Sequence, residues 1–169
     1  MKKYLALSLI AVSLFSCKSA KDQFQFEKIA FSSSMCFGFC PSYQMEINND
    51  RSVRMHGDSV FGKRFENANI DRSKTGYFTG TVADTTYNKL LKELRTIGLD
   101  TVKFGGPDCC DGSIKTIVVY YNGKRKFLKA MFPPEHAHAL IATLQDIYST
   151  TPFVPTTQKF EIERDSIRK

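Results

Sequence analysis

The sequence of 169 residues has few features typical of an enzyme. It places no serine in a nucleophile elbow, has no phosphate-binding glycine loop and has no carboxylate pair spaced for acid–base catalysis. Gly105 and Gly106 precede Pro107 and no helix start follows them, so they indicate a turn. These absences argue against the common hydrolase and nucleotide-binding classes. We expect a protein that is not an enzyme, with no catalytic residue and no cofactor.

Concentrated charge of one sign is also missing. The formal net charge is +7, but the 24 Lys and Arg residues are scattered along the chain. The densest run, Lys124-Arg125-Lys126, lies at a predicted hairpin tip, where solvated charge is usual. A patch for anionic lipid or glycan is the alternative interpretation of this run. The composition gives no support for binding to nucleic acid.

Long apolar runs are absent after residue 15. The one run before it, residues 4–15, follows Lys2 and Lys3 and is too short to span a bilayer as a mature helix. Ser16 and Cys17 come next, and the whole layout resembles a bacterial lipobox, in which cleavage precedes a lipid-modified cysteine. The resemblance implies a signal peptide over residues 1–16, a lipid anchor on Cys17 and a polar tether over residues 17–23.

The expected location follows from this anchor. A lipidated Cys17 places the chain in the bacterial cell envelope, with the membrane as a partner through the lipid alone. The residues after it, Lys18-Ser19-Ala20-Lys21-Asp22, lack an acidic cluster of the kind that directs export to the cell surface. We therefore expect the protein in the outer membrane, facing the periplasm.

Four cysteines remain after Cys17, an even number in an oxidising compartment, where disulfides are the rule. Three pairings are possible, and the sequence does not choose among them. Cys36 and Cys40 are four residues apart, and Gly38 eases the turn that a bridge between them needs. Copper binding or thiol exchange is the alternative, but Pro41 leads into a strand and not into an activating helix, which favours a structural bridge.

Cys109 and Cys110 are adjacent and more ambiguous. They can bridge each other through a strained, easily reduced bond, or each can bridge to Cys36 or Cys40. Four converging cysteines can also bind zinc or copper(I). The spacing fits none of the common zinc patterns, so we predict structural disulfides at these four positions and no metal site.

Alternation with a period of two predicts the strands. Residues 24–31 form the first, and residues 43–47 and 53–55 form a hairpin around the turn at residues 48–51. Further strands are expected over residues 60–65 and 77–82. Residues 114–121 are apolar on both faces, which predicts a strand covered on two sides. Asn122-Gly123 is a strong hairpin signal, so residues 124–132 return beside it.

Two helices follow from apolar residues at intervals of three and four. The first has Asp84 as its predicted N-cap and Gly98 in a left-handed C-terminal position. The second opens at Pro133-Pro134 and ends before Pro152. We predict a single α+β domain over residues 24–152, a mostly antiparallel sheet built from hairpins with both amphipathic helices packed on one face. Residues 153–169 are predicted to be a polar tail, in which Phe160 and Ile162 add an edge strand.

The three histidines give no convincing metal pair or general base. His136 and His138 lie about 200° apart around a helix axis, so they cannot hold one ion together. We expect all three, including His56 on the polar face of its strand, to be exposed to solvent.

The run Cys36-Phe37-Gly38-Phe39-Cys40-Pro41-Ser42-Tyr43, followed by a hairpin, resembles a family of small exported bacterial proteins of unknown function with a C-F-G-x-C-P-x-Y signature. The resemblance spans about residues 24–149 and implies a lipoprotein or periplasmic domain without a known activity. The resulting hypothesis is a lipid-anchored, non-enzymatic binding module for an envelope protein or glycan. The alternative is a thiol-redox or metal protein that uses the four mature cysteines.

Overall fold

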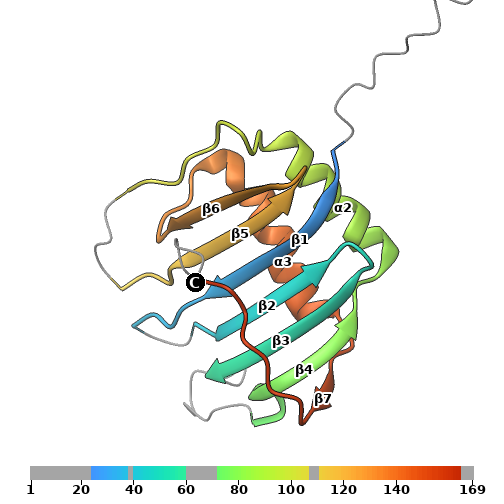
Figure 1. The fold of residues 1–169 in the computed structure, drawn as a ribbon. Coiled ribbons are helices and arrows are strands. Elements are labelled where there is room, and N and C mark those ends of the chain that lie inside the picture. The colour runs from blue at the N-terminus through green and yellow to red at the C-terminus, as the bar shows by residue number, and fades with distance from the viewer. Residues whose placement is uncertain (1–23, 38–39, 60–71, 107–110, 165–169) are drawn as a thin grey trace, which may run out of the picture.

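The computed structural model describes residues 24–37, 40–59, 72–106 and 111–164. Outside these ranges lie the predicted signal peptide and tether, Cys17, Cys109, Cys110 and the whole of the predicted strand at 60–65. Within them the chain forms one antiparallel sheet in the order β6-β5-β1-β2-β3-β4-β7. Both helices lie behind this sheet as Figure 1 shows it. The predicted fold class, a mostly antiparallel α+β fold with two helices on one face, is confirmed.

Six of the seven strands in the described residues lie close to the segments in which the alternation predicts them, and the seventh, at residues 154–156, lies in the predicted tail. They are β1 (Phe26–Ser33), β2 (Ser42–Asn48), β3 (Ser52–Ser59), β4 (Gly76–Thr81), β5 (Lys115–Tyr121), β6 (Lys124–Ala130) and β7 (Val154–Thr156). The β5–β6 turn has positive φ at both Asn122 and Gly123, 50° and 69°, as the predicted hairpin turn requires. β1 pairs with β2 on one side and with β5 on the other, so the first strand joins the two hairpins.

Helix α2 spans Asp84–Thr96 and helix α3 spans His138–Thr150, preceded by a 3-10 turn at Glu135–Ala137. Gly98 has φ +70°, as the predicted left-handed end of α2 requires. The N-cap prediction is wrong: Ala83 is the N-cap, and Asp84 is the first helical residue. The Asp84 carboxylate instead pairs with Arg51 in the β2–β3 turn. It still benefits from the positive end of the helix dipole.

The main core lies between the sheet and the helices. Its fully buried members come from the helix-facing positions of the strands and from one stripe on each helix, including Ile29, Met45, Ile117, Leu90 and Leu144. Because neighbouring residues of a strand point to opposite faces, Ala30 and Val118 face away from the helices. They are nevertheless buried, at 2 % and 0 % exposure, in a second small cluster with Ile162.

Residues 157–164, which we call the strap, cover this second face. Figure 1 shows them running from β7 across the front of the sheet, on the side opposite the helices. The predicted edge strand of Phe160 and Ile162 is therefore wrong, because the edge strand is Val154–Thr156, paired with β4. Phe160 and Ile162 pack on the sheet face, where they join the small apolar cluster of Ala30 and Val118 and leave contact with water.

Candidate functional site

The cysteine loop connects β1 to β2. Cys36 and Cys40 form a disulfide with 5.4 Å between their Cα atoms, so the predicted bridge at these two positions has structural support. Pro41 leads into β2, which begins at Ser42, so no helix N-terminus follows Cys40 and lowers a thiol pKa. Cys109 and Cys110 lie outside the described residues, and their predicted bridges stay predictions.

Backbone hydrogen bonds join the cysteine loop to the segment that follows Cys110. The Phe37 N–H donates to the Asp111 carbonyl at 3.2 Å, and the Ser34 N–H donates to the Ile114 carbonyl at 3.0 Å. These bonds continue the β1–β5 pairing beyond the strand ends. The loop of Cys36 and Cys40 therefore lies beside Asp111, although about 70 residues separate the two segments in the sequence.

A cluster of hydroxyl and amine groups supports the base of these loops. Lys115 Nζ donates to Ser33 Oγ at 2.7 Å and to Ser113 Oγ at 3.0 Å, and Ser113 Oγ donates to the Ser34 carbonyl at 2.5 Å. Burial lowers the pKa of the Lys115 ammonium. The cluster joins β1 to the start of β5, because its hydroxyl groups donate their protons in hydrogen bonds between these two segments. Sequence reasoning missed it, since none of its members forms a local motif.

The end of the sheet around these loops carries an apolar rim, which we define as Met35, Phe37 and Phe132. Their side chains are 54 %, 88 % and 54 % exposed. The Phe37 N–H bonds to the Asp111 carbonyl, and Phe132 lies beside the next residue, Gly112, so the three residues belong to the same end of the sheet. Scattered exposed apolar residues are ordinary, but a cluster on one loop system indicates an interaction surface.

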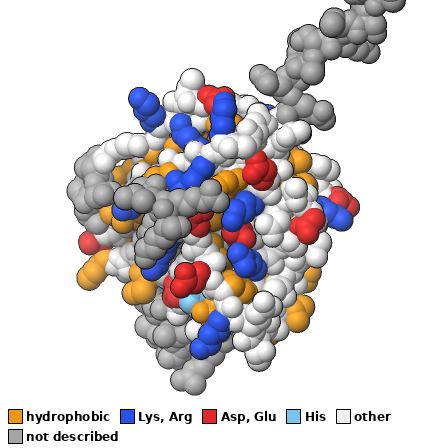
Figure 2. Space-filling model, in the orientation of Figure 1, with side chains coloured by type: hydrophobic (Ala, Val, Ile, Leu, Met, Phe, Trp, Pro, Cys, Tyr) orange, Lys and Arg blue, Asp and Glu red, His pale blue; other side chains and the backbone are white. Residues whose placement is uncertain are grey.

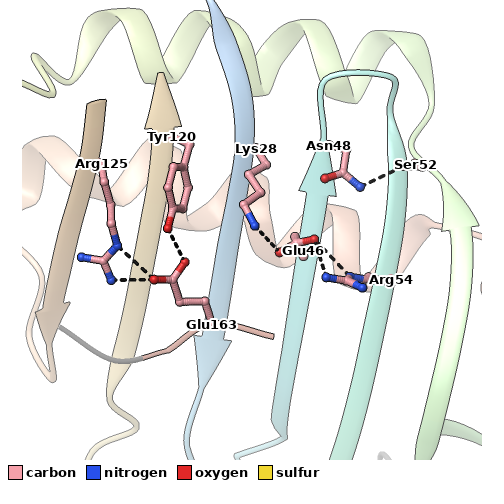
Figure 3. Close-up of polar contacts among 8 residues, drawn as sticks. All are labelled: Lys28, Glu46, Asn48, Ser52, Arg54, Tyr120, Arg125 and Glu163. Atoms are coloured by element: carbon pink, nitrogen blue, oxygen red, sulfur yellow. Dashed lines mark hydrogen bonds and ion pairs between the residues drawn. The ribbon is translucent and has the colours of Figure 1, made fainter. Parts of the chain in front are cut away.

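The face opposite the helices carries a buried charge cluster (Figure 3). The Glu46 side chain is 5 % exposed, and its carboxylate lies 3.1 Å from Lys28 Nζ and 2.8 Å from Arg54 Nη2. Lys28 and Arg54 are about one-third exposed and lie on the two strands beside β2. The alternation predicts Glu46 on a polar face, but burial of that face could not be seen in the sequence.

The strap adds a second carboxylate to this face. Glu163 accepts hydrogen bonds from Tyr120 Oη at 2.7 Å and from Arg125 Nε at 3.0 Å, with Arg125 Nη2 at 2.9 Å (Figure 3). Burial raises the pKa of this carboxyl, but the bonds from Tyr120 and Arg125 and the charge of Lys28 outweigh it, so the net shift is downward. Both Arg125 nitrogens contact Oε1 and Tyr120 donates to Oε2, so each oxygen of the Glu163 carboxylate has a donor, and the bond from the guanidinium is charge-assisted.

Phe160 and Ile162 complete the strap. The Phe160 ring meets the edge of Tyr77 at 5.0 Å between centroids and lies 5.2 Å from the Arg54 guanidinium carbon. Ile162 packs on Ala30 and Val118. Figure 2 shows charges of both signs interleaved over the surface around the strap.

The histidines are placed largely as predicted. His136 and His138 are exposed near the start of α3. The prediction for His56 is wrong: it is half-buried, stacked on Tyr77 with 4.3 Å between ring centroids, and its Nδ1 lies 3.3 Å from an Asp58 oxygen. Among the described residues, no group of three His, Cys, Asp or Glu side chains is arranged to hold a metal ion.

A hollow of about 510 Å³ opens at the other end of the sheet, beside Phe24 and the start of β1. Its one carboxylate, Asp100, accepts hydrogen bonds from Tyr121 Oη at 3.1 Å and Lys124 Nζ at 2.9 Å. These bonds lower the pKa of Asp100. The carboxylate of this hollow is thus already paired within the protein.

Comparison with known proteins identifies a family for this fold. Residues 27–148 match the family described as Domain of unknown function (DUF6438). The chain belongs to this family. The match confirms that the chain carries an uncharacterised domain, and it includes β1 through most of α3, with Cys36 and Cys40, but not the strap. No curated protein matches the chain. None of the helices in the described part of the chain has the length and apolarity of a membrane span.

Proposed function

We propose that this DUF6438 protein is a lipid-anchored, non-enzymatic binding module of the bacterial cell envelope. The proposal is supported by the lipobox-like start of the sequence, with Cys17 after a short apolar run. Lipidation of Cys17 would tether the domain to the outer membrane on its periplasmic side. The partner would be another envelope protein.

The observation that carries the binding proposal is the exposure of Phe37. Its ring is 88 % exposed on a loop closed by the Cys36–Cys40 disulfide and bonded to Asp111. A loop held in this way loses little conformational entropy when it binds, which favours affinity. Aromatic and methionine side chains are also enriched at protein interfaces. An apolar rim with these properties suits a protein partner better than a hydrated glycan.

The position of the rim supports the same partner. The tether would enter the domain at Phe24, whereas the rim lies beyond the far end of β1, Phe26–Ser33. Eight residues of strand span roughly 26 Å at about 3.3 Å per residue. The rim therefore lies at the end opposite the tether entry, so we expect it to face the periplasm and not the lipid to which Cys17 is attached.

Site-specific photocrosslinking in cells tests the partner proposal. We expect a photoreactive phenylalanine analogue at Phe37 to capture one discrete protein. The matched control is the same analogue at Val154, which is also apolar and 63 % exposed but lies on β7. Equal adducts at both positions, or capture of glycan alone at Phe37, would contradict the proposal.

Metabolic labelling tests the anchor. We expect radiolabelled palmitate to be incorporated into the wild-type chain and not into the Cys17→Ser variant, which should also leave the membrane fraction. Unchanged fractionation of Cys17→Ser would remove the anchor from the proposal but would leave the rim as a binding surface.

A thiol-redox role is the second candidate, because the hydrogen bond between Phe37 and Asp111 brings the Cys36–Cys40 loop beside the segment after Cys110. Disulfide exchange between the pairs Cys36–Cys40 and Cys109–Cys110 would need this proximity. Thiol titration of the native protein under non-reducing conditions distinguishes the two functions. A readily reduced pair supports redox chemistry, whereas four unreactive cysteines support the binding module.

A further inference from the structure

The strap occupies a surface that has the features of a peptide-binding site. Ala30 and Val118 form the apolar floor of this surface. At one side of it, Tyr120 and Arg125 donate hydrogen bonds to the Glu163 carboxylate. Towards the other side, Tyr77 and Arg54 receive the Phe160 ring. Figure 3 shows Glu163 approaching Tyr120 and Arg125 from the strap, which crosses in front of the strands.

Three strap side chains contact the sheet: Phe160, Ile162 and Glu163. The intervening Glu161 and the preceding residues 157–159 are exposed. Because the strap lies over the sheet face and not along an edge, its backbone does not extend the ladder of strand hydrogen bonds. The surface therefore recognises an extended segment through three of its side chains, at positions i, i+2 and i+3.

The family match includes the residues of this surface but not the strap that covers it. All the receiving residues named above lie within residues 27–148, whereas the strap begins at residue 157. The receiving surface thus belongs to the family domain, and the segment that covers it lies beyond the matched part.

We propose that this face of the sheet is a recognition site for an extended acidic peptide segment, and that the strap occupies it as a displaceable ligand in cis. The segment would present an aromatic residue, an aliphatic residue two positions later and a carboxylate at the next position. The proposal depends neither on lipidation of Cys17 nor on the apolar rim.

Charge favours an acidic peptide as the occupant. The surface presents Lys28, Arg54 and Arg125 around the strap, and its buried acid, Glu46, is already paired with the first two. An aliphatic side chain in the place of Ile162 would bury apolar surface against Ala30 and Val118, which favours binding. An anionic sugar has no such side chain to bury. A strap that must be displaced would lower the apparent affinity for such a partner.

A fluorescence reporter tests displacement in the otherwise intact chain. The sequence has no tryptophan, so Phe160→Trp in a Cys17→Ser background provides a single emission signal from the strap. The probe is a synthetic peptide with the sequence of residues 157–164. We expect excess peptide to shift the emission to longer wavelength as the indole becomes exposed to water. The same peptide with Glu163→Gln should need at least about tenfold more for the same shift, since it loses a charged partner of Arg125.

A variant with an open surface tests binding directly. The full chain carrying Phe160→Ala, Ile162→Ser and Glu163→Gln should bind the labelled peptide at least about tenfold more tightly than the wild-type chain. Adding Arg125→Gln should abolish that gain. Lys129→Gln, which removes an exposed positive charge from the same strand, is the matched control and should leave peptide binding unchanged.

Three results would overturn the proposal. The first is an unshifted emission at saturating peptide together with no binding by the open variant. The second is unfolding of the open variant, seen by circular dichroism, because the strap would then be an obligatory part of the core. The third is an emission that depends on protein concentration without peptide, because a second copy would then be the occupant.

Discussion

The Glu46 carboxylate lies 2.8 Å from the Arg54 guanidinium across the β2–β3 pair, on a face that the strap covers. Lys28 approaches the same carboxylate from β1 at 3.1 Å. One buried acid thus joins three adjacent strands through two cations that keep about one-third of their side-chain surface in water. This arrangement makes Glu46 the most informative position for testing the front of the sheet.

We expect Glu46→Gln to lower the free energy of unfolding by about 1–3 kcal/mol, because the neutral amide loses two charge-assisted bonds while Lys28 and Arg54 stay close to each other. Urea unfolding followed by circular dichroism measures this change. Glu135→Gln is the matched control, since Glu135 is exposed. It should change the stability by less than about 0.5 kcal/mol. Equal effects of the two substitutions would contradict the role assigned to Glu46.

The β5–β6 turn provides a second prediction. Gly123 has φ +69°, where a side chain is strained, so Gly123→Ala should lower the free energy of unfolding by about 1 kcal/mol. Gly105→Ala is the control, because Gly105 also has open space around its Cα but no left-handed φ. It should be neutral or slightly stabilising. A loss of stability in Gly105→Ala as large as in Gly123→Ala would show that strain in the turn is not the cause.

The Cys36–Cys40 bridge closes a loop of five residues. Loop-closure entropy for so short a loop predicts a stabilisation of about 2 kcal/mol. We therefore expect the double variant Cys36→Ser, Cys40→Ser to lose about this much stability in thermal or urea unfolding under oxidising conditions. Under reducing conditions wild type and variant should become equally stable. A difference that persists in reductant would show that the side chains and not the bond cause the loss.

Strap docking should depend on pH through Glu163. Its pKa in the docked state is below the ordinary value of 4.5, so docking favours the ionised form. The stabilisation is fully present above the ordinary pKa and is lost as the pH falls through the lower, docked value. The fluorescence of the Phe160→Trp variant, titrated from about pH 7 to pH 3, should therefore report release of the strap in acid.

The control for this titration is Glu163→Gln in the same reporter background, which leaves Tyr120 on β5, Arg125 on β6 and Lys28 on β1 in place. Its emission should show no transition assignable to Glu163. An identical acid transition with and without Glu163 would show that the titration of Glu163 does not release the strap.

The local patterns predicted most elements because their causes are local. The alternation around Met45 and Val53 and the turn between them specify a hairpin wherever that segment is placed. Gly98 and Asn122-Gly123 mark chain turns through their own backbone preferences. Asp84 shows where this reasoning fails, since its carboxylate pairs with Arg51 from a different element and does not cap its own helix. A distant partner competes with a local one, and the sequence does not show that partner.

By itself, the sequence determined the α+β class, the two amphipathic helices, the hairpins and the close spacing of Cys36 and Cys40, because each depends on neighbours within a few residues. Only the tertiary structure decided that β1 lies between the two hairpins, that Glu46 is buried and that the strap covers the second sheet face. These features depend on contacts between segments tens of residues apart, whose free energy comes from burying surfaces against one another. A strand pattern shows that a face is polar or apolar, but the rest of the folded chain decides what covers that face.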